Sequence, residues 1–180
     1  IPQAIRDDLA ALVTGLKKEI PGPRWVRPEG MHLTLRFIGD VAEADLARLR
    51  GEVTRNLPGP IRPFDVRVEG LGLFPEKGRP RVLWVGLVEP SGAMVALQSL
   101  VDRAVVAAAL PGVKKEERPF RPHLSLARFG DAKPPSGLAQ ALAARQERGW
   151  GQFTVSSVCL FQSLLKPGGA EYRRLEEHKL

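Results

Sequence analysis

The tetrapeptide His32-Leu33-Thr34-Leu35 returns in nearly the same form as His123-Leu124-Ser125-Leu126. Two of the three histidines in the chain therefore each begin a unit of histidine, aliphatic, hydroxyl and aliphatic residues. From average residue usage, two such units would arise by chance on the order of a few times in ten thousand sequences. The repeat indicates that the two units share a role.

Strand geometry gives each unit two different faces. Successive side chains of a strand point to opposite faces, so the histidine and the hydroxyl share one face and the leucines share the other. Phe37 continues the apolar face of the first unit, and we expect it to pack in the core rather than stack on a base. Two imidazoles and two hydroxyls could then meet across a cleft.

Length and composition are those of a soluble globular protein. A chain of 180 residues, 43% hydrophobic and 26% charged, suits one domain or two small lobes that share a core. The most apolar stretch, Ala93 to Leu110, is interrupted by Gln98, Asp102 and Arg103, which predicts an amphipathic helix rather than a membrane span. No signal peptide is evident, and the single cysteine, Cys159, excludes an intrachain disulfide. We expect a cytosolic protein with Cys159 packed in its core.

The net charge of +7 favours anionic partners. It is carried by 19 arginines against 8 lysines, and the planar guanidinium suits bidentate contacts with phosphate. Solvated surface arginines would give the same composition, so charge alone does not decide the function. The three histidines are far apart and no His-Glu-x-x-His or paired-carboxylate motif is present, so we expect no metal.

Helical and strand periodicities alternate along the chain. Helices are predicted at 2–19, 42–57, 94–108 and 137–147, and strands at 31–38, 64–69, 82–88, 153–161 and 172–175, with a further strand beginning at Pro122. Turns are predicted at Pro21-Gly22-Pro23, Pro58-Gly59-Pro60 and Pro167-Gly168-Gly169. Adjacent strands with interspersed helices indicate an α+β fold with mostly antiparallel sheets. The repeat suggests two interlocked lobes, each presenting its histidine strand toward the other.

The two histidine segments, read with their flanks, resemble a known family. Trp25-Val26, Met31-His32-Leu33-Thr34-Leu35-Arg36-Phe37-Ile38-Gly39 and Phe120-Arg121-Pro122-His123-Leu124-Ser125-Leu126-Ala127-Arg128 resemble the two-histidine (2H) phosphoesterases. More narrowly, they resemble the bacterial and archaeal RNA 2′,3′-cyclic phosphodiesterases, long called 2′-5′ RNA ligases. The loop and strand from 74 to 86 and the tail residues Ser163, Leu165, Gly168 and Tyr172 are similar to that subfamily too, so the likeness covers nearly the whole chain.

The resemblance implies a single bilobal domain over residues 1–180. The fold would be α+β, with two mostly antiparallel sheets related by a pseudo-twofold axis, helices on the outside and both histidine strands lining a central cleft. Family members usually begin with a strand just before the first helix, whereas this sequence opens at Ile1-Pro2. Without that strand, one sheet would be smaller.

The resemblance also implies hydrolysis of RNA 2′,3′-cyclic phosphate ends to 2′-phosphates, with neither a metal nor another cofactor. Water must lose a proton and the departing ribose oxygen must gain one, on opposite sides of phosphorus. Imidazole titrates near neutrality, so one histidine can be neutral while the other is protonated. By the family's pattern His123 is the base that activates water, and His32 is the acid that protonates the 3′ oxygen.

Four further residues are implied in phosphate binding. Thr34 and Ser125 would donate hydroxyl hydrogen bonds to the non-bridging oxygens. Arg128 matches a basic residue often found just after the second motif, but simple alternation puts it on the face opposite His123, so the chain must twist or leave the strand first. Arg36, two residues beyond Thr34, lies on the chemical face by the same counting and is a second candidate.

Other conspicuous residues are expected to be structural. His178 lies in a charged tail, and we expect it to be solvated. Trp25, Trp84 and Trp150 are far apart in sequence, so we expect each to pack in the core or at its rim.

The alternatives to this function either keep the two-histidine chemistry with another substrate or have no catalytic activity. The same fold could act on 2′-5′-linked oligonucleotides or ADP-ribose cyclic phosphate, or could join tRNA halves through a 2′-5′ linkage. A non-catalytic RNA-binding module is a third reading, which salt-dependent binding without turnover would favour. The expected partner is RNA or a nucleotide with a 2′,3′-cyclic phosphate end, with no membrane association and a monomeric chain.

Overall fold

A computed structural model describes residues 1–57, 61–130, 135–166 and 169–180. It divides into two compact units, each assembled from three separate segments of the chain. Unit 1 comprises Ile1–Leu33, Asp65–Val88 and Pro122–Phe153; unit 2 comprises Thr34–Phe64, Glu89–Arg121 and Thr154–Leu180. Unit 1 contains the second histidine motif and His32, and the first motif is divided between the units because unit 2 begins at Thr34.

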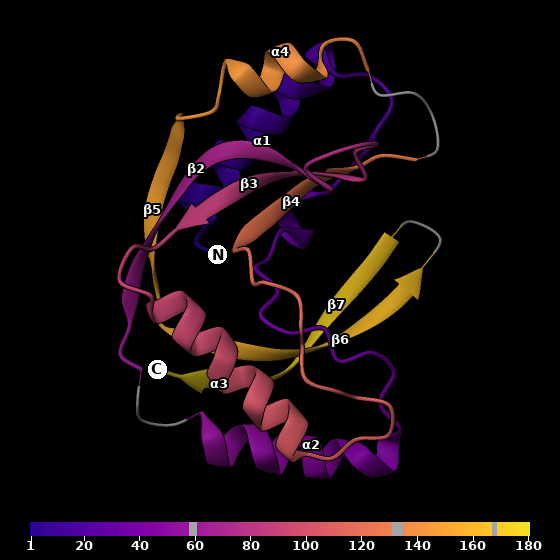
Figure 1. Cartoon of the computed structure of the whole chain (residues 1–180), viewed down its shortest axis with the longest axis vertical. Helices are drawn as coiled ribbons and strands as arrows, with labels where there is room; N and C mark the ends of the chain where they lie inside the picture. The colour runs from indigo at the N-terminus through magenta and orange to yellow at the C-terminus, as the bar shows by residue number, and fades with distance from the viewer. Residues whose placement is uncertain (58–60, 131–134, 167–168) are drawn as a thin grey trace. The chain divides into compact units, whose positions relative to one another are not determined.

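Unit 1 is built on a five-stranded sheet with the order β1-β4-β3-β2-β5 (Figure 1). The strands are β1 Arg24–Trp25, β2 Phe64–Phe74, β3 Val82–Val88, β4 His123–Arg128 and β5 Gly149–Val155. Neighbours β1 and β4, β4 and β3, and β3 and β2 run antiparallel, as the sequence predicted for the fold class. Helices α1 (Gln3–Glu19) and α4 (Leu138–Ala143) and the 3-10 turn η1 (Pro28–Gly30) complete the unit.

One face of this sheet forms a hydrophobic core with α1. Leu9 and Leu16 of α1 are fully buried, at the helical spacing read from the sequence. They share a cluster with Leu83 of β3 and Leu124 and Leu126 of β4. Because side chains alternate along a strand, the intervening residues of β3 and β4 lie on the other face of the sheet.

Unit 2 contains the two longer remaining helices and a β-hairpin. The helices are α2 Glu43–Asn56 and α3 Ala93–Ala107, and the hairpin pairs β6 (Ser157–Lys166) with β7 (Gly169–Lys179) in antiparallel register. Leu49 and Val53 of α2 pack against Ala104 and Val105 of α3. The described helices include none long and apolar enough to cross a membrane.

The first histidine segment forms no strand in the structure. Residues 31–38 were predicted as a strand, and the described structure assigns them no ladder pairing. Leu33 packs against the core of unit 1, whereas Leu35 and Ile38 pack against the core of unit 2. The apolar residues of this segment are thus divided between two cores, because the chain leaves unit 1 after Leu33.

Phe37 is 74% exposed, so the expectation that it packs in the core is wrong. The alternation breaks at Arg36, which turns inward to an ion pair with Asp102. Phe37, the next residue, consequently faces outward.

Several predicted strands have different limits in the structure. The single strand predicted at 153–161 is two strands in the structure: β5 ends at Val155 and β6 begins at Ser157. The break lies close to Thr154, where the chain enters unit 2. Strand β2 continues to Phe74, and α4 ends at Ala143. The turns predicted at 58–60 and 167–168 lie outside the described residues.

The last strand, β7, is longer than predicted and includes His178, which pairs with Val158 in register. The His178 side chain is 13% exposed and its Nε2 lies 3.2 Å from Oε2 of Glu176, so the expectation that His178 is solvated is wrong. The charged residues around His178 indicate a tail in the sequence, but a strand of a two-stranded hairpin can carry charged residues and still pair. Cys159, expected in the core, is half-buried in β6.

Candidate active site

The second histidine motif lies on the face of the unit 1 sheet opposite the core with α1; we call this the open face. In β4, Leu124 and Leu126 are fully buried in the core, whereas His123 and Ser125 are only half-buried. This is the division of faces that the alternation in the sequence predicts.

A β-bulge next to Ser125 changes the face that the rest of β4 presents. Trp84 of β3 pairs with Ser125, but the preceding residue Leu83 pairs with Ala127, so Leu126 is the extra residue. Leu126 and Ala127 are consecutive buried residues, and Arg128 after them is exposed. Simple alternation would put Arg128 on the core face. The extra residue of the bulge reverses this, so Arg128 lies on the same face as His123 and Ser125.

Two aromatic rings flank the His123 imidazole. The Phe74 ring is nearly perpendicular to it, with centroids 4.9 Å apart, and the Trp84 ring centroid is 6.2 Å away. Trp84 lies over Gly72 of β2, where a Cβ atom would overlap the indole ring. The glycine thus lets the indole lie against the sheet, and the two rings restrict the orientations open to the imidazole.

The position of Trp84 agrees with the expectation of rim packing, but its contact with His123 was not predicted. Trp84 and His123 come from strands whose register depends on the bulge. Alternation within β3 places Trp84 on the open face. This alternation is the sequence pattern that could have indicated a position near His123. Trp150 is buried in the unit 1 core, and Trp25 packs against it, as expected.

The first histidine motif begins where η1 ends. Met31 is 1% exposed and anchors the segment, while His32 and Thr34 are both exposed. The imidazole Nδ1 of His32 lies 2.7 Å from the carbonyl oxygen of Gly30, which accepts a hydrogen bond when Nδ1 is protonated. Thr34 is the first residue of unit 2.

Arg36 is held inside unit 2 by two carboxylates. Its Nε lies 3.0 Å from Oδ1 of Asp102, its Nη1 lies 3.1 Å from Oε2 of Glu116, and Nη2 donates to the carbonyl of Lys114. The Arg36 side chain is only 9% exposed. These contacts give Arg36 a structural role in unit 2, and its role in phosphate binding stays a prediction. No pattern in the sequence indicated the ion pairs, because both partners lie far along the chain.

Glu116 stays ionised to well below neutral pH. Hydrogen bonds from the side chain and the backbone N–H of Arg118 hold the pKa of the Glu116 carboxyl at about 2, with a smaller contribution from the charge of Arg36. The carboxylate that pairs with Arg36 therefore remains negative over the whole physiological range.

Metal-binding side chains do not gather in the described residues. No group of three or more histidines, cysteines, aspartates or glutamates there is arranged to hold a metal ion.

An antiparallel sheet that presents a histidine and a hydroxyl on its open face, preceded in the chain by a second such pair, defines a phosphoesterase of the two-histidine class. A family model described as "LigT like Phosphoesterase" matches residues 1–84 and 88–172. The chain belongs to this family.

Two curated relatives of the chain share one name. The chain is similar to the "RNA 2′,3′-cyclic phosphodiesterase" of Methanothermobacter thermautotrophicus, with 31% identity over 100% of this chain and 95% of the relative. It is also similar to the protein of that name from Aeropyrum pernix, with 35% identity over 86% of this chain and 84% of the relative.

Solved structures share the fold. TT0787 of Thermus thermophilus superposes with a TM-score of 0.79 and 28% identity, covering 100% of this chain and 93% of that one. Escherichia coli LigT, in a structure described as complexed with 3′-AMP, superposes with a TM-score of 0.75 over 100% of this chain and 93% of that one. At 22% identity, the second comparison concerns the fold alone.

Proposed function

We propose that the protein hydrolyses the 2′,3′-cyclic phosphate ends of RNA to 2′-phosphates, by proton transfer to and from two histidines and without a metal ion. The observation that carries the proposal is the open face of β4, where the bulge puts Arg128 on the same side as His123 and Ser125. A base, a hydroxyl donor and a cation on one face are the groups that attack on a phosphodiester requires. The names of the curated relatives support the choice of substrate.

The two histidines take opposite roles in one in-line displacement. His123 removes a proton from water, whose oxygen attacks phosphorus while the bond from phosphorus to the 3′ oxygen breaks. His32 then gives a proton to the departing 3′ oxygen, so the product keeps its phosphate on the 2′ oxygen. Each positioned acid or base typically contributes about 10²- to 10⁴-fold to the rate.

The contact of His32 with Gly30 suits the acid role. A hydrogen on Nδ1 donates to the Gly30 carbonyl in both the neutral and the protonated imidazole, so it can stay in place through the cycle. The proton given to the 3′ oxygen then comes from Nε2, and the hydrogen bond helps to orient the ring.

Three side chains stabilise the negative charge that develops on phosphate. The hydroxyls of Ser125 and Thr34 donate to the non-bridging oxygens, and Arg128 supplies a positive charge. The net charge of +7 adds a general attraction for RNA, which weakens as the salt concentration rises.

The test is turnover of a short RNA with a 2′,3′-cyclic phosphate end in EDTA, with the product position assigned by ³¹P NMR. The proposal predicts a 2′-phosphate. A 3′-phosphate would overturn the assigned leaving group, and activity only on a 2′-5′-linked RNA control would overturn the substrate. RNA binding without turnover of either RNA would overturn the enzymatic proposal itself.

A further inference from the structure

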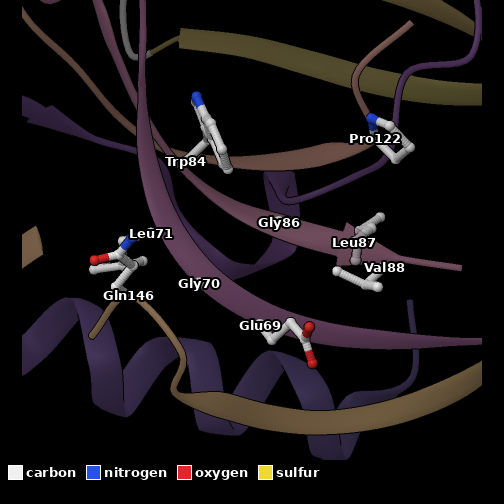
Figure 2. Close-up of a pocket in the computed structure, with 9 residues that line it drawn as sticks. All are labelled: Glu69, Gly70, Leu71, Trp84, Gly86, Leu87, Val88, Pro122 and Gln146. Atoms are coloured by element: carbon white, nitrogen blue, oxygen red, sulfur yellow. The ribbon is translucent and has the colours of Figure 1, made fainter. Parts of the chain in front are cut away.

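The open face of the unit 1 sheet has a shallow hollow of about 350 Å³ beside the His123 strand (Figure 2). Gly70 on β2 and Gly86 on β3 are among the residues that line it. A Cβ atom at Gly86 would come within 2.7 Å of the Glu69 carbonyl oxygen, so glycine is required by the close approach of the two strands. We call this feature the glycine hollow.

Three residues that line the glycine hollow are neighbours of His123, the proposed catalytic base. Gly86 is the register partner of His123, Pro122 of the hollow's wall directly precedes it, and Trp84 of the wall flanks its ring. A group bound in the hollow would therefore be a near neighbour of the atom that reacts with His123.

The walls suit a flat, uncharged ring with hydrogen-bond donors at its edge. Figure 2 shows Trp84 and Pro122 on one side of the hollow and Glu69 on the opposite side. Of the residues lining the hollow, Glu69 alone is ionisable. A carboxylate repels phosphate but accepts hydrogen bonds from amino groups, and its second oxygen can accept even though Oε2 receives a bond from Arg67.

We propose that the glycine hollow binds the nucleobase of the terminal nucleotide, the one whose ribose carries the cyclic phosphate, and prefers amino-bearing bases to uracil. The inference rests on the proposed function and adds a specificity to it. The volume lies at the lower end of the range for small-molecule sites, which fits one base. Trp84 and Pro122 contact the ring, and Glu69 accepts from the exocyclic amino group of adenine, cytosine or guanine.

The first experiment compares four dinucleotides that differ only in the terminal base beside the cyclic phosphate. Uracil is expected to give a KM about tenfold higher than each amino-bearing base, the usual effect of one hydrogen bond to a charged group, with similar kcat values. Binding of adenosine 2′-phosphate and uridine 2′-phosphate, followed by tryptophan fluorescence with Trp84→Phe as the reference, gives the same comparison without turnover.

Two variants, each with a matched control variant, separate base recognition from folding. Glu69→Gln can donate to the O4 atom of uracil, so the preference for amino-bearing bases should fall to about unity or reverse; Arg67→Gln breaks the same ion pair but keeps the carboxylate, and should keep the preference. Val88→Phe, which adds bulk at the wall, should raise KM for all four bases; Gln152→Phe on the neighbouring β5 should not.

The outcomes distinguish the two proposals. Equal KM values for all four dinucleotides, unchanged by Glu69→Gln and Val88→Phe, would overturn the base site and leave the proposed function standing. Failure of the wild type to hydrolyse any of the four would overturn the proposed function, and this inference with it.

Discussion

The ion pair between Arg36 and Asp102 is expected to contribute strongly to the stability of unit 2. Both side chains are less than a tenth exposed, and Oδ1 of Asp102 also accepts from the backbone N–H of Glu116 at 3.2 Å. Removing one partner of a buried pair typically costs about 3–5 kcal/mol, because the other charge is left uncompensated. Glu116 still faces Arg36, so we expect Asp102→Asn to lower the free energy of unfolding by about 3 kcal/mol, the low end of that range.

The assay is equilibrium unfolding in urea, followed by far-UV circular dichroism because all three tryptophans lie in unit 1. Asp45→Asn is the matched control: its pair with Arg48 spans 2.6 Å but half of the Arg48 side chain is exposed, so the loss should be about 0–1 kcal/mol. The double variant Arg36→Met with Asp102→Leu should recover most of the stability, since it leaves no buried charge. A loss for Asp102→Asn no larger than that for Asp45→Asn would refute the reasoning.

Three more changes have expected outcomes. Because the pKa of Glu116 is lowered to about 2, its carboxylate contributes stability above pH ~4.3 that is lost as the pH falls toward 2. Urea titrations at pH 5 and pH 3 should therefore show a smaller fall in the free energy of unfolding for Glu116→Gln than for the wild type. Ser125→Ala should lower kcat by about 10²- to 10³-fold while Ser125→Thr keeps most of it, and equal kcat values for the two would contradict a hydroxyl donor. Gly72→Ala should displace the Trp84 indole and lower kcat, with a change in tryptophan fluorescence; an unchanged spectrum would contradict the packing.

The second histidine strand could be predicted because its pattern is local. Alternation along β4 assigns His123 and Ser125 to one face and the leucines to the core, and the structure confirms that division. The same pattern in the first motif gave a wrong prediction of a strand, because a segment outside the sheet can also alternate when its apolar residues pack against two separate cores. Strand pairing depends on partners distant in sequence, which periodicity does not report.

Arg36 and Arg128 also show that periodicity along the chain does not report contacts with distant residues. Counting along the strand put Arg36 on the chemical face and Arg128 on the core face, and the structure reverses both. Arg36 turns inward to carboxylates on α3 and the loop after it, and the bulge in β4 turns Arg128 outward. The resemblance to a family proposed Arg128 as a phosphate-binding residue, and that role stays a prediction. The monomeric state stays a prediction, which light scattering would check.

The most direct test of the central claim compares His32→Asn, His123→Asn and His178→Asn for turnover of an RNA 2′,3′-cyclic phosphate in EDTA, with RNA affinity measured in parallel. The account predicts that the first two variants bind RNA but each lose at least about 10²-fold in kcat. His178→Asn, which alters the histidine paired with Glu176 in β7, should keep wild-type kcat. Full activity in either His32→Asn or His123→Asn would contradict acid–base catalysis by two histidines.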